Sequence, residues 1–151
     1  MYGPADATLI VLSDGPLDQA VINALEASAE KLGHKALCVA TLGEARAAGV
    51  ESDPRDDAPA EALAAYIAEA DPWAVVAIDD ASVEALRAAF GGESRALAPD
   101  APVNVLGYEL VAAPAFAECL GDAAVKRVAW RRLQAARHPG NPLARQNPSS
   151  S

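Results

Sequence analysis

The chain has 151 residues, the size of one domain with a buried core, and only 5% of them are aromatic although 52% are hydrophobic. No basic-then-apolar leader opens the sequence, and no apolar run approaches the ~18 residues needed to cross a bilayer, so we expect a cytoplasmic protein without membrane contact. The net charge of −9 repels phosphate backbones, so we expect nucleic-acid binding to be weak or absent.

Short apolar runs alternate with helical patterns along the chain. Runs bounded by turn residues predict strands at 7–12, 35–41, 73–78 and 102–106, and 108–112 either extends the last of these or forms a fifth strand. Apolar residues at helical spacing predict helices at 16–32, 59–70, 81–90 and 123–137. We predict a loop with a short helical turn at 42–50 and a loop at 93–101.

Local signals set the ends of the predicted helices. Pro16 suits the first position of the first helix, where its missing N–H would have no partner. Gly33 suits the end of that helix, which leaves His34 on the surface. Asp80 suits the N-cap of the helix at 81–90, which leaves Asp79 solvated.

The alternation of strands and helices predicts an α/β fold. Right-handed crossovers give a three-layer α/β/α arrangement around a mostly parallel sheet of four or five strands, with the first strand central. Residues 1–137 form a single domain in this prediction, and 138–151, which are rich in Pro, Asn and Ser, form a flexible tail.

Candidate binding residues follow from this fold, because ligands of open α/β sheets lie beyond the carboxyl ends of the strands. The candidates at those ends are Ser13, Gly15, Pro16, Ala40, Thr41, Asp79, Ala113 and Pro114. Asp14 is the candidate catalytic residue, as a base or a water-positioning carboxylate, although it also suits the positive end of the following helix. Asp79 and Asp80 are open to a second interpretation as a carboxylate pair for acid/base work or Mg²⁺.

Basic residues gather on the last predicted helix. A candidate anion contact there consists of Lys126, Arg127, Arg131 and Arg132. The alternative is a solvated face whose cations stabilise the negative end of the helix. The cysteines Cys38 and Cys119 lie in apolar runs and are predicted to stay unpaired. We predict no metal site and no cofactor.

Several segments carry a family resemblance in their order and spacing. Residues 9–16 read LIVLSDGP, and 71–78, at the end of a helix, read DPWAVVAI. Residues 113–115 read Ala-Pro-Ala, and Lys126, Trp130 and Leu133 follow on the last helix. These segments resemble the uracil-DNA glycosylase superfamily, most closely its bacterial branches. Residues 9–16 are similar to that family's first strand with its Gly-Glu-Ala-Pro-Gly turn, and residues 71–78 to its Lys-Pro followed by a strand. Residues 113–115 and the last helix are similar to its His-Pro-Ser motif and final helix. The resemblance spans about residues 7–135 and implies a uracil-DNA glycosylase-like fold.

The chain departs from that family where the chemistry would be. Ala113 stands at the position of the catalytic histidine, and Ala40 or Thr41 at that of the asparagine that reads uracil. The family's longer loop after the first strand, with a water-positioning acidic residue and a stacking phenylalanine, is replaced by a direct path into the helix. Some bacterial branches bind an iron–sulfur cluster through four cysteines, which two separated cysteines cannot do.

The resemblance therefore implies a degenerate active site. We expect a non-catalytic scaffold or protein-interaction module with another protein as its partner, the role that a similar fold plays in the clamp-loader psi subunit of bacterial replicases. The first alternative is an active base-excision glycosylase or nucleotide-processing enzyme that uses Asp14 or Asp79 in a rebuilt site. The second is a flavodoxin-like domain that binds a small ligand or a nucleotide.

Overall fold

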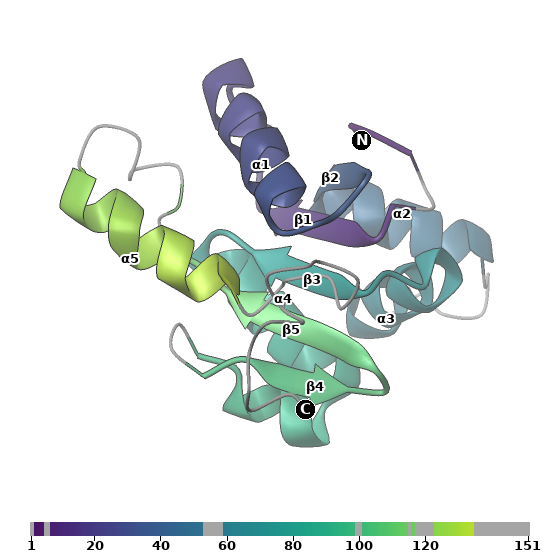
Figure 1. Cartoon of the computed structure of the whole chain (residues 1–151). Coiled ribbons are helices and arrows are strands. Elements are labelled where there is room, and N and C mark those ends of the chain that lie inside the picture. The colour runs from purple at the N-terminus through teal and green to yellow at the C-terminus, as the bar shows by residue number, and fades with distance from the viewer. Residues whose placement is uncertain are drawn as a thin grey trace.

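The computed structural model of the chain describes residues 2–4, 7–52, 59–98, 101–114, 116 and 123–134. Its elements, in chain order, are β1 (Leu9–Ser13), α1 (Gln19–Lys31), β2 (Leu37–Thr41), α2 (Leu42–Ser52), α3 (Pro59–Ala70), β3 (Ala74–Ala77), α4 (Asp80–Phe90), the 3₁₀ helix η1 (Gly92–Ala96), β4 (Val103–Val105), β5 (Tyr108–Ala112) and α5 (Ala123–Leu133) (Figure 1). The predicted tail at 138–151 and Cys119 lie outside the described residues.

The sheet has five strands in the order β2-β1-β3-β5-β4. β1 pairs in parallel with both β2 and β3, and β3 pairs in parallel with β5. β4 is the exception, because it joins β5 as an antiparallel hairpin at the edge. The predicted mostly parallel sheet is confirmed, and 108–112 forms a strand of its own. The first strand lies inside the sheet as expected, although β3 holds the middle position.

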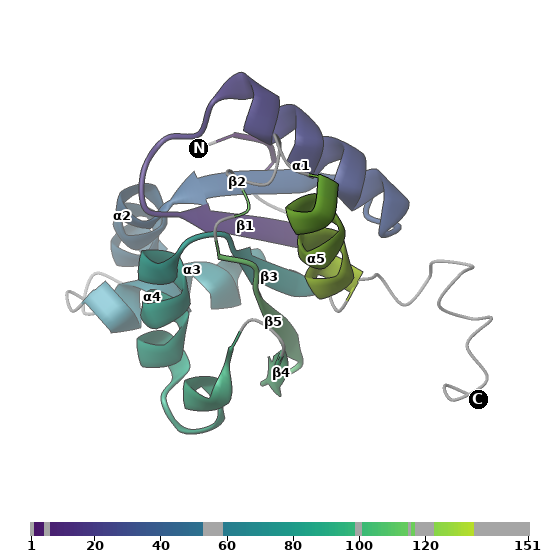
Figure 2. The same cartoon turned by 90° about the vertical axis from the view of Figure 1, so that its left-hand side faces the viewer.

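Helices cover both faces of the sheet, as the continuous apolar runs of the strands predict. Successive residues of β1 point to opposite faces: Ile10 and Leu12 belong to one buried cluster, and Leu9 and Val11 to the other. The first cluster contains side chains of α2, α3 and α4, and the second contains those of α1 and α5. Figure 2 shows α1 and α5 together on one side of the sheet. The three-layer α/β/α arrangement is therefore present.

The prediction of a loop with a short turn at 42–50 is wrong, because α2 runs from Leu42 to Ser52. The helix begins with a capping box. The Glu44 N–H donates to Thr41 Oγ1 at 3.2 Å, and the Thr41 N–H donates to Glu44 Oε1 at 3.0 Å. Further along, a Cβ on Gly49 would lie 1.7 Å from the carbonyl oxygen of Ala62 in α3. Close approach of α2 and α3 thus requires a glycine inside a helix.

Two predictions at the ends of α1 are also wrong. The chain remains extended through Asp18 (φ −65°, ψ 152°), so α1 begins at Gln19 and Pro16 lies in the loop before it. At the other end, Gly33 ends the helix at φ +89°, as predicted. The N–H groups of Gly33 and His34 donate to Glu30 and Ala29 in a Schellman motif, which turns His34 inward. His34 is therefore buried, with Nδ1 2.8 Å from Thr8 Oγ1.

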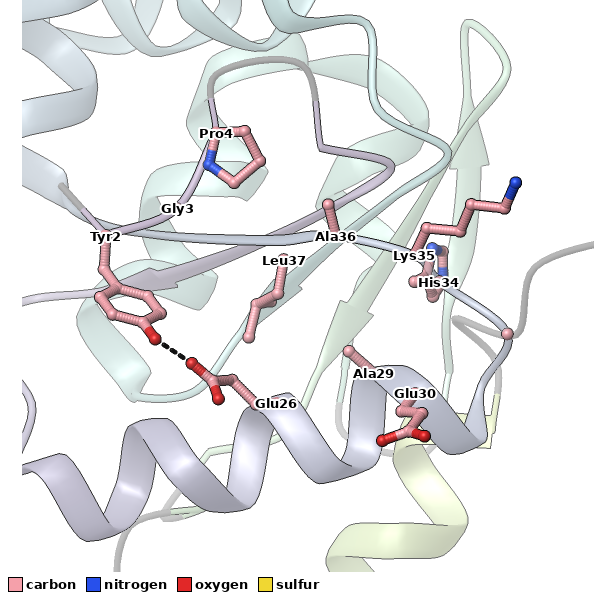
Figure 3. Close-up of a pocket in the computed structure, with 11 residues that line it drawn as sticks. Tyr2, Gly3, Pro4, Glu26, Ala29, Glu30, His34, Lys35, Ala36 and Leu37 are labelled. Carbon is pink, nitrogen blue, oxygen red and sulfur yellow. Dashed lines mark hydrogen bonds between the residues drawn. The ribbon is translucent and has the colours of Figure 1, made fainter.

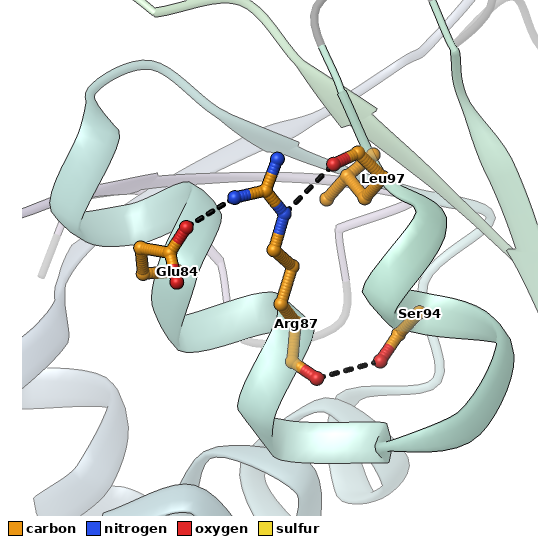
Figure 4. A network of polar contacts seen from close by, with 4 residues as sticks. All are labelled: Glu84, Arg87, Ser94 and Leu97. Atoms are coloured by element: carbon orange, nitrogen blue, oxygen red, sulfur yellow. Dashed lines mark hydrogen bonds and ion pairs between the residues drawn. The ribbon is translucent and has the colours of Figure 1, made fainter.

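Polar contacts fix the segment after α4, where the prediction of a loop at 93–101 is partly wrong because η1 spans Gly92–Ala96 (Figure 4). The buried Ser94 hydroxyl donates to the carbonyl oxygen of Arg87 at 2.9 Å, and Arg87 Nε donates to the carbonyl oxygen of Leu97 at 2.8 Å. Glu84 pairs with the same arginine. These bonds join α4 to η1 and to Leu97, which precede the edge strand β4.

Candidate functional site

The carboxyl ends of β1 and β2 meet at one edge of the sheet, where Ser13 lies beside Thr41 in register. A hollow of about 540 Å³ opens there. Its lining includes five residues that the sequence places in the candidate site, namely Ser13, Asp14, Gly15, Pro16 and Thr41. The lining also includes six residues that were not predicted: Tyr2, Leu17, Ile22, Val39, Gly43 and Glu44. We call this surface the strand-end hollow.

The remaining predicted residues do not line the strand-end hollow. Ala40 and Ala113 are buried, at 0% and 1% exposure, so neither presents a side chain to a ligand. Pro114 is half-buried at the end of β5. Because β3 lies between β1 and β5, Ala113 and Pro114 stand two strands away from Ser13, whereas Ala40 lies on the neighbouring strand β2.

The Ser13 side chain is occupied within its own turn. Its hydroxyl donates to the carbonyl oxygen of Gly15 at 2.7 Å, and the residue is 1% exposed. This bond holds the tight turn that carries the chain out of β1. Ser13 therefore positions the backbone of the strand-end hollow and offers no exposed nucleophile.

Thr41 and Glu44 are committed to the N-terminus of α2 by the capping box described above. Their side chains line the strand-end hollow while each bonds a backbone N–H of the other residue. The sequence signal for this pair is Thr-x-x-Glu before an apolar run, which indicates the start of a helix where a loop with a short turn was predicted.

Asp79 is the N-cap of α4. Its Oδ1 accepts the Ser82 N–H at 2.8 Å, and its Oδ2 accepts the Asp14 N–H at 2.7 Å. The predictions that Asp80 caps this helix and that Asp79 is solvated are therefore wrong. The extended backbone of Asp79 (φ −148°, ψ 166°) is the conformation that N-cap residues adopt, whereas Asp80 is already the first residue of α4.

This carboxylate also lies at the point of the sheet where open α/β folds bind ligands. The chain leaves β1 toward α1 on one face and leaves β3 toward α4 on the other, so this point lies between these neighbouring strand ends. Backbone N–H groups at such a point would bind an anion. Here the Asp79 carboxylate takes the N–H groups of Asp14 and Ser82, and it fills that role from within the chain.

Asp14 differs from Ser13, Thr41 and Asp79, because it is exposed at the rim of the strand-end hollow. Glu44 lines the same hollow from α2. Because Glu44 Oε1 already accepts the Thr41 N–H, Asp14 is the candidate general base at this hollow. Within the described residues, no group of three or more His, Cys, Asp or Glu residues could hold a metal ion.

The candidate anion contact lies on α5, away from the strand-end hollow. Arg127 and Arg131 are exposed, Arg132 is half-buried, and each of the three already interacts with other groups of the protein. The side chain of Lys126 lies outside the described residues. The half-buried Trp130 ring lies under Lys31 Nζ of α1, 5.8 Å from the ring centroid. The aromatic ring is thus in contact with a side chain of α1.

A larger hollow of about 860 Å³ lies between α1 and the segment at 2–4 (Figure 3). The Tyr2 hydroxyl donates to Glu26 across it, and the backbone of Tyr2 exchanges two hydrogen bonds with Val39 at the edge of β2. Glu30 and Lys35 stand at its rim with charges of opposite sign. This hollow lies toward the amino end of β2, and the sequence predicted no site there.

In comparisons with known proteins, no family model and no curated protein matches the chain. Among the described residues, none of the helices has the length and apolar character that a membrane span requires.

Proposed function

We propose that the chain is a uracil-DNA glycosylase-like α/β domain that lacks glycosylase activity and serves as a protein-interaction or scaffold module. The observation that carries the proposal is the use of the polar groups at the strand ends. Asp79, Ser13 and Thr41 each bond a backbone group of their own chain. Groups that hold the fold together in this way are not available to read a base or to stabilise a leaving group.

The two alanines at family positions support the same conclusion. A glycosylase extrudes a base and holds it in a polar pocket, and negative charge develops on the base as it leaves. Ala113 has no side-chain donor for that charge, and neither Ala40 nor Thr41 has an amide for the base edge. Ala113 and Ala40 are buried, and the Thr41 hydroxyl accepts the Glu44 N–H of the capping box. Losing one such donor alone lowers the rate by roughly 10²–10³.

One observation favours the enzyme as a second candidate. The exposed Asp14 carboxylate lines the strand-end hollow together with Glu44, and about 540 Å³ is in the range of small-ligand pockets. Asp14 is therefore the residue around which a rebuilt active site would operate. Asp79 is less suited to that role, because both of its oxygens accept backbone N–H groups.

Incubation with single-stranded DNA that contains one uracil, followed by alkali and gel electrophoresis, separates the two candidates. We expect no cleavage above the protein-free control after an hour. Stoichiometric cleavage that Asp14→Asn abolishes would establish the enzyme and refute the scaffold. Asp80→Asn is the matched control, because it removes an exposed carboxylate on α4 that does not line the strand-end hollow.

The proposal includes weak or absent binding to nucleic acid and a cytoplasmic location. The net charge of −9 repels a phosphate backbone, and the described arginines of α5 already have partners within the protein. A titration of fluorescent duplex DNA at physiological salt should therefore show no saturation below micromolar concentration. Sub-micromolar affinity would contradict this part of the proposal.

A further inference from the structure

An exposed apolar surface lies at the amino end of the sheet, opposite to the strand-end hollow. Trp73 is 36% exposed and Leu106 is 82% exposed. Both line a shallow hollow of about 320 Å³, whose other lining residues are Thr8, Asp71, Pro72, Gly107 and Tyr108. We call Asp71, Trp73, Leu106 and Tyr108 the hairpin tip. None of them belongs to the candidate site predicted from the sequence.

The aromatic part of the hairpin tip is held firmly by the sheet. The Glu109 N–H donates to the carbonyl oxygen of Trp73 at 3.1 Å, which sets Tyr108 beside Trp73 on the neighbouring strand. The Trp73 N–H in turn donates to the carbonyl oxygen of Thr8 at 2.8 Å. Behind this surface the Tyr108 ring packs against Phe90, with ring centroids 6.1 Å apart. The two aromatic residues therefore form a preorganised surface.

Leu106 occupies a position that the fold itself does not favour for leucine. Val105 and Tyr108 are paired, so Leu106 and Gly107 form the whole turn of the β4–β5 hairpin (Figure 1). Both have positive φ, at +54° and +90°. Such turns favour Asn-Gly or Asp-Gly, because a branched apolar residue is strained at positive φ. With 82% exposure the side chain gains little burial in return.

Leu106 is thus unfavourable for both the conformation and the solvation of the isolated chain. A strained position at the edge of an exposed hollow is a recognised indication of a binding role. Contact with another molecule would bury the leucine and give it the apolar environment that the chain does not supply. Together with Trp73, it forms a pair of large apolar side chains beside one hollow.

Charge indicates what kind of partner fits. Asp71, the last residue before Pro72, ends α3 at φ +49° and is exposed at the rim of the hollow. Partial burial and then the negative charge of Asp71 raise the pKa of Tyr108, so the field of this carboxylate reaches the aromatic ring. A carboxylate beside tryptophan and tyrosine rings attracts a cation through both Coulomb and cation–π interactions.

We infer that the hairpin tip binds a segment of a partner protein that presents an arginine or lysine next to an apolar side chain. The inference rests on the proposed function as an interaction module and names the surface and the partner chemistry. The cation would lie against Trp73 and Tyr108 near Asp71, and the apolar residue would cover Leu106. A small organic cation would fill the hollow but would leave the protruding leucine in water, so an extended protein segment fits better.

Selection of peptides from a displayed random library against the whole chain tests the inference. We expect the selected peptides to be enriched in arginine or lysine beside leucine or an aromatic residue. Synthetic copies should bind at least tenfold more weakly to Trp73→Thr, Asp71→Asn and Leu106→Asn, and their affinity should fall as salt is raised. Asn tolerates positive φ, so the last two variants should remain folded. Val50→Gln is the matched control, because Val50 is 37% exposed on α2, outside the hairpin tip.

Three results of the peptide experiment would overturn the inference. They are a library that yields no binders, selected peptides without basic enrichment, and binding that the hairpin-tip variants leave unchanged. Sedimentation of the chain alone tests whether a second copy of the chain occupies the hairpin tip instead. A dimer that Leu106→Asn dissociates would show that it does, and would also overturn the inference. None of these measurements depends on DNA. Uracil excision in the separate assay would refute the proposed function. The peptide experiment would still decide, independently, whether the hairpin tip binds a basic segment.

Discussion

Asp79 holds the loop after β1 through the backbone of Asp14, whose N–H lies 2.7 Å from Asp79 Oδ2. The same carboxylate caps α4 through the N–H of Ser82 at 2.8 Å. One side chain therefore connects the turns that leave two neighbouring parallel strands for opposite faces of the sheet. Because hydrogen bonds to a charged acceptor are stronger than neutral ones, this link is a determinant of how rigid the strand ends are.

Replacing Asp79 with alanine should lower the free energy of unfolding by about 2 kcal/mol, because a helix cap and a second backbone bond are lost together. Asp79→Asn keeps one acceptor oxygen and should lie between wild type and alanine. Urea unfolding followed by circular dichroism measures the difference. Asp80→Asn removes only an exposed charge from the first turn of α4 and should lower the free energy of unfolding by less than ~1 kcal/mol. Equal effects of the Asp79 and Asp80 changes would contradict the role of Asp79.

Two glycines of α2 should respond in opposite ways to alanine. At Gly49 the added Cβ would lie 1.7 Å from the Ala62 carbonyl oxygen, so Gly49→Ala must push α2 away from α3. We expect a loss of about 1–3 kcal/mol, which outweighs the gain in helix propensity. At Gly43 nothing lies within 4 Å of the added Cβ, so Gly43→Ala should be neutral or stabilise by up to ~1 kcal/mol. Thermal unfolding of both variants measures this contrast, and a stable Gly49→Ala variant would refute close packing at this point.

Strands β1, β2 and β3 were predictable because they are buried on both faces and read as continuous apolar runs. The sheet order was not, because nothing in a single sequence states that β3 separates β1 from β5. This is why Ser13 and Thr41 lie side by side, whereas Ala113 follows a strand on the far side of β3. In a parallel sheet the carboxyl ends of all strands lie at the same edge. The order of the strands along that edge depends on how the helices pack across the whole sheet.

The helix α2 was missed for a different reason. After the buried Leu42, its buried residues are the small Ala45 and Gly49, which leave no apolar periodicity to detect. The Thr41–Glu44 capping pair was the available signal. Asp79 and Asp80 show the other limit, since adjacent identical residues are both plausible caps. Only the backbone conformation decides which one precedes the helix.

Tyr66 should make the fold sensitive to alkali. Burial, and secondly contact with the Cys38 thiol 3.5 Å away, raise the pKa of its phenol above the ordinary 10.0. The unfolded chain releases this proton near pH 10 while the folded chain keeps it. The retained proton therefore contributes to the free energy of unfolding in full below about pH 10. This contribution is lost as pH rises toward the raised pKa, by up to ~1.4 kcal/mol per pH unit.

Tyr66→Phe should accordingly flatten the fall in melting temperature between pH 9 and pH 11, while costing less than ~1.5 kcal/mol at neutral pH. Tyr108→Phe is the matched control, because Tyr108 is less buried and should change the pH profile less. Parallel profiles for wild type and Tyr66→Phe would show that the Tyr66 phenol ionises equally in the folded and unfolded states.

Leu106→Asn should stabilise the isolated chain. Leucine at φ +54° in a two-residue hairpin turn is strained by about 1 kcal/mol, and asparagine is favoured at this position. The free energy of unfolding should rise by about that amount, which corresponds to roughly 4 °C in melting temperature for a domain of this size. Leu106→Ala separates the effect of backbone strain on stability from the effect of apolar exposure. It removes most of the exposed apolar surface but keeps a Cβ at positive φ. It should therefore stabilise less than asparagine. If Leu106→Asn instead lowers the melting temperature, the leucine stabilises the hairpin itself, and its conformation no longer argues for a partner.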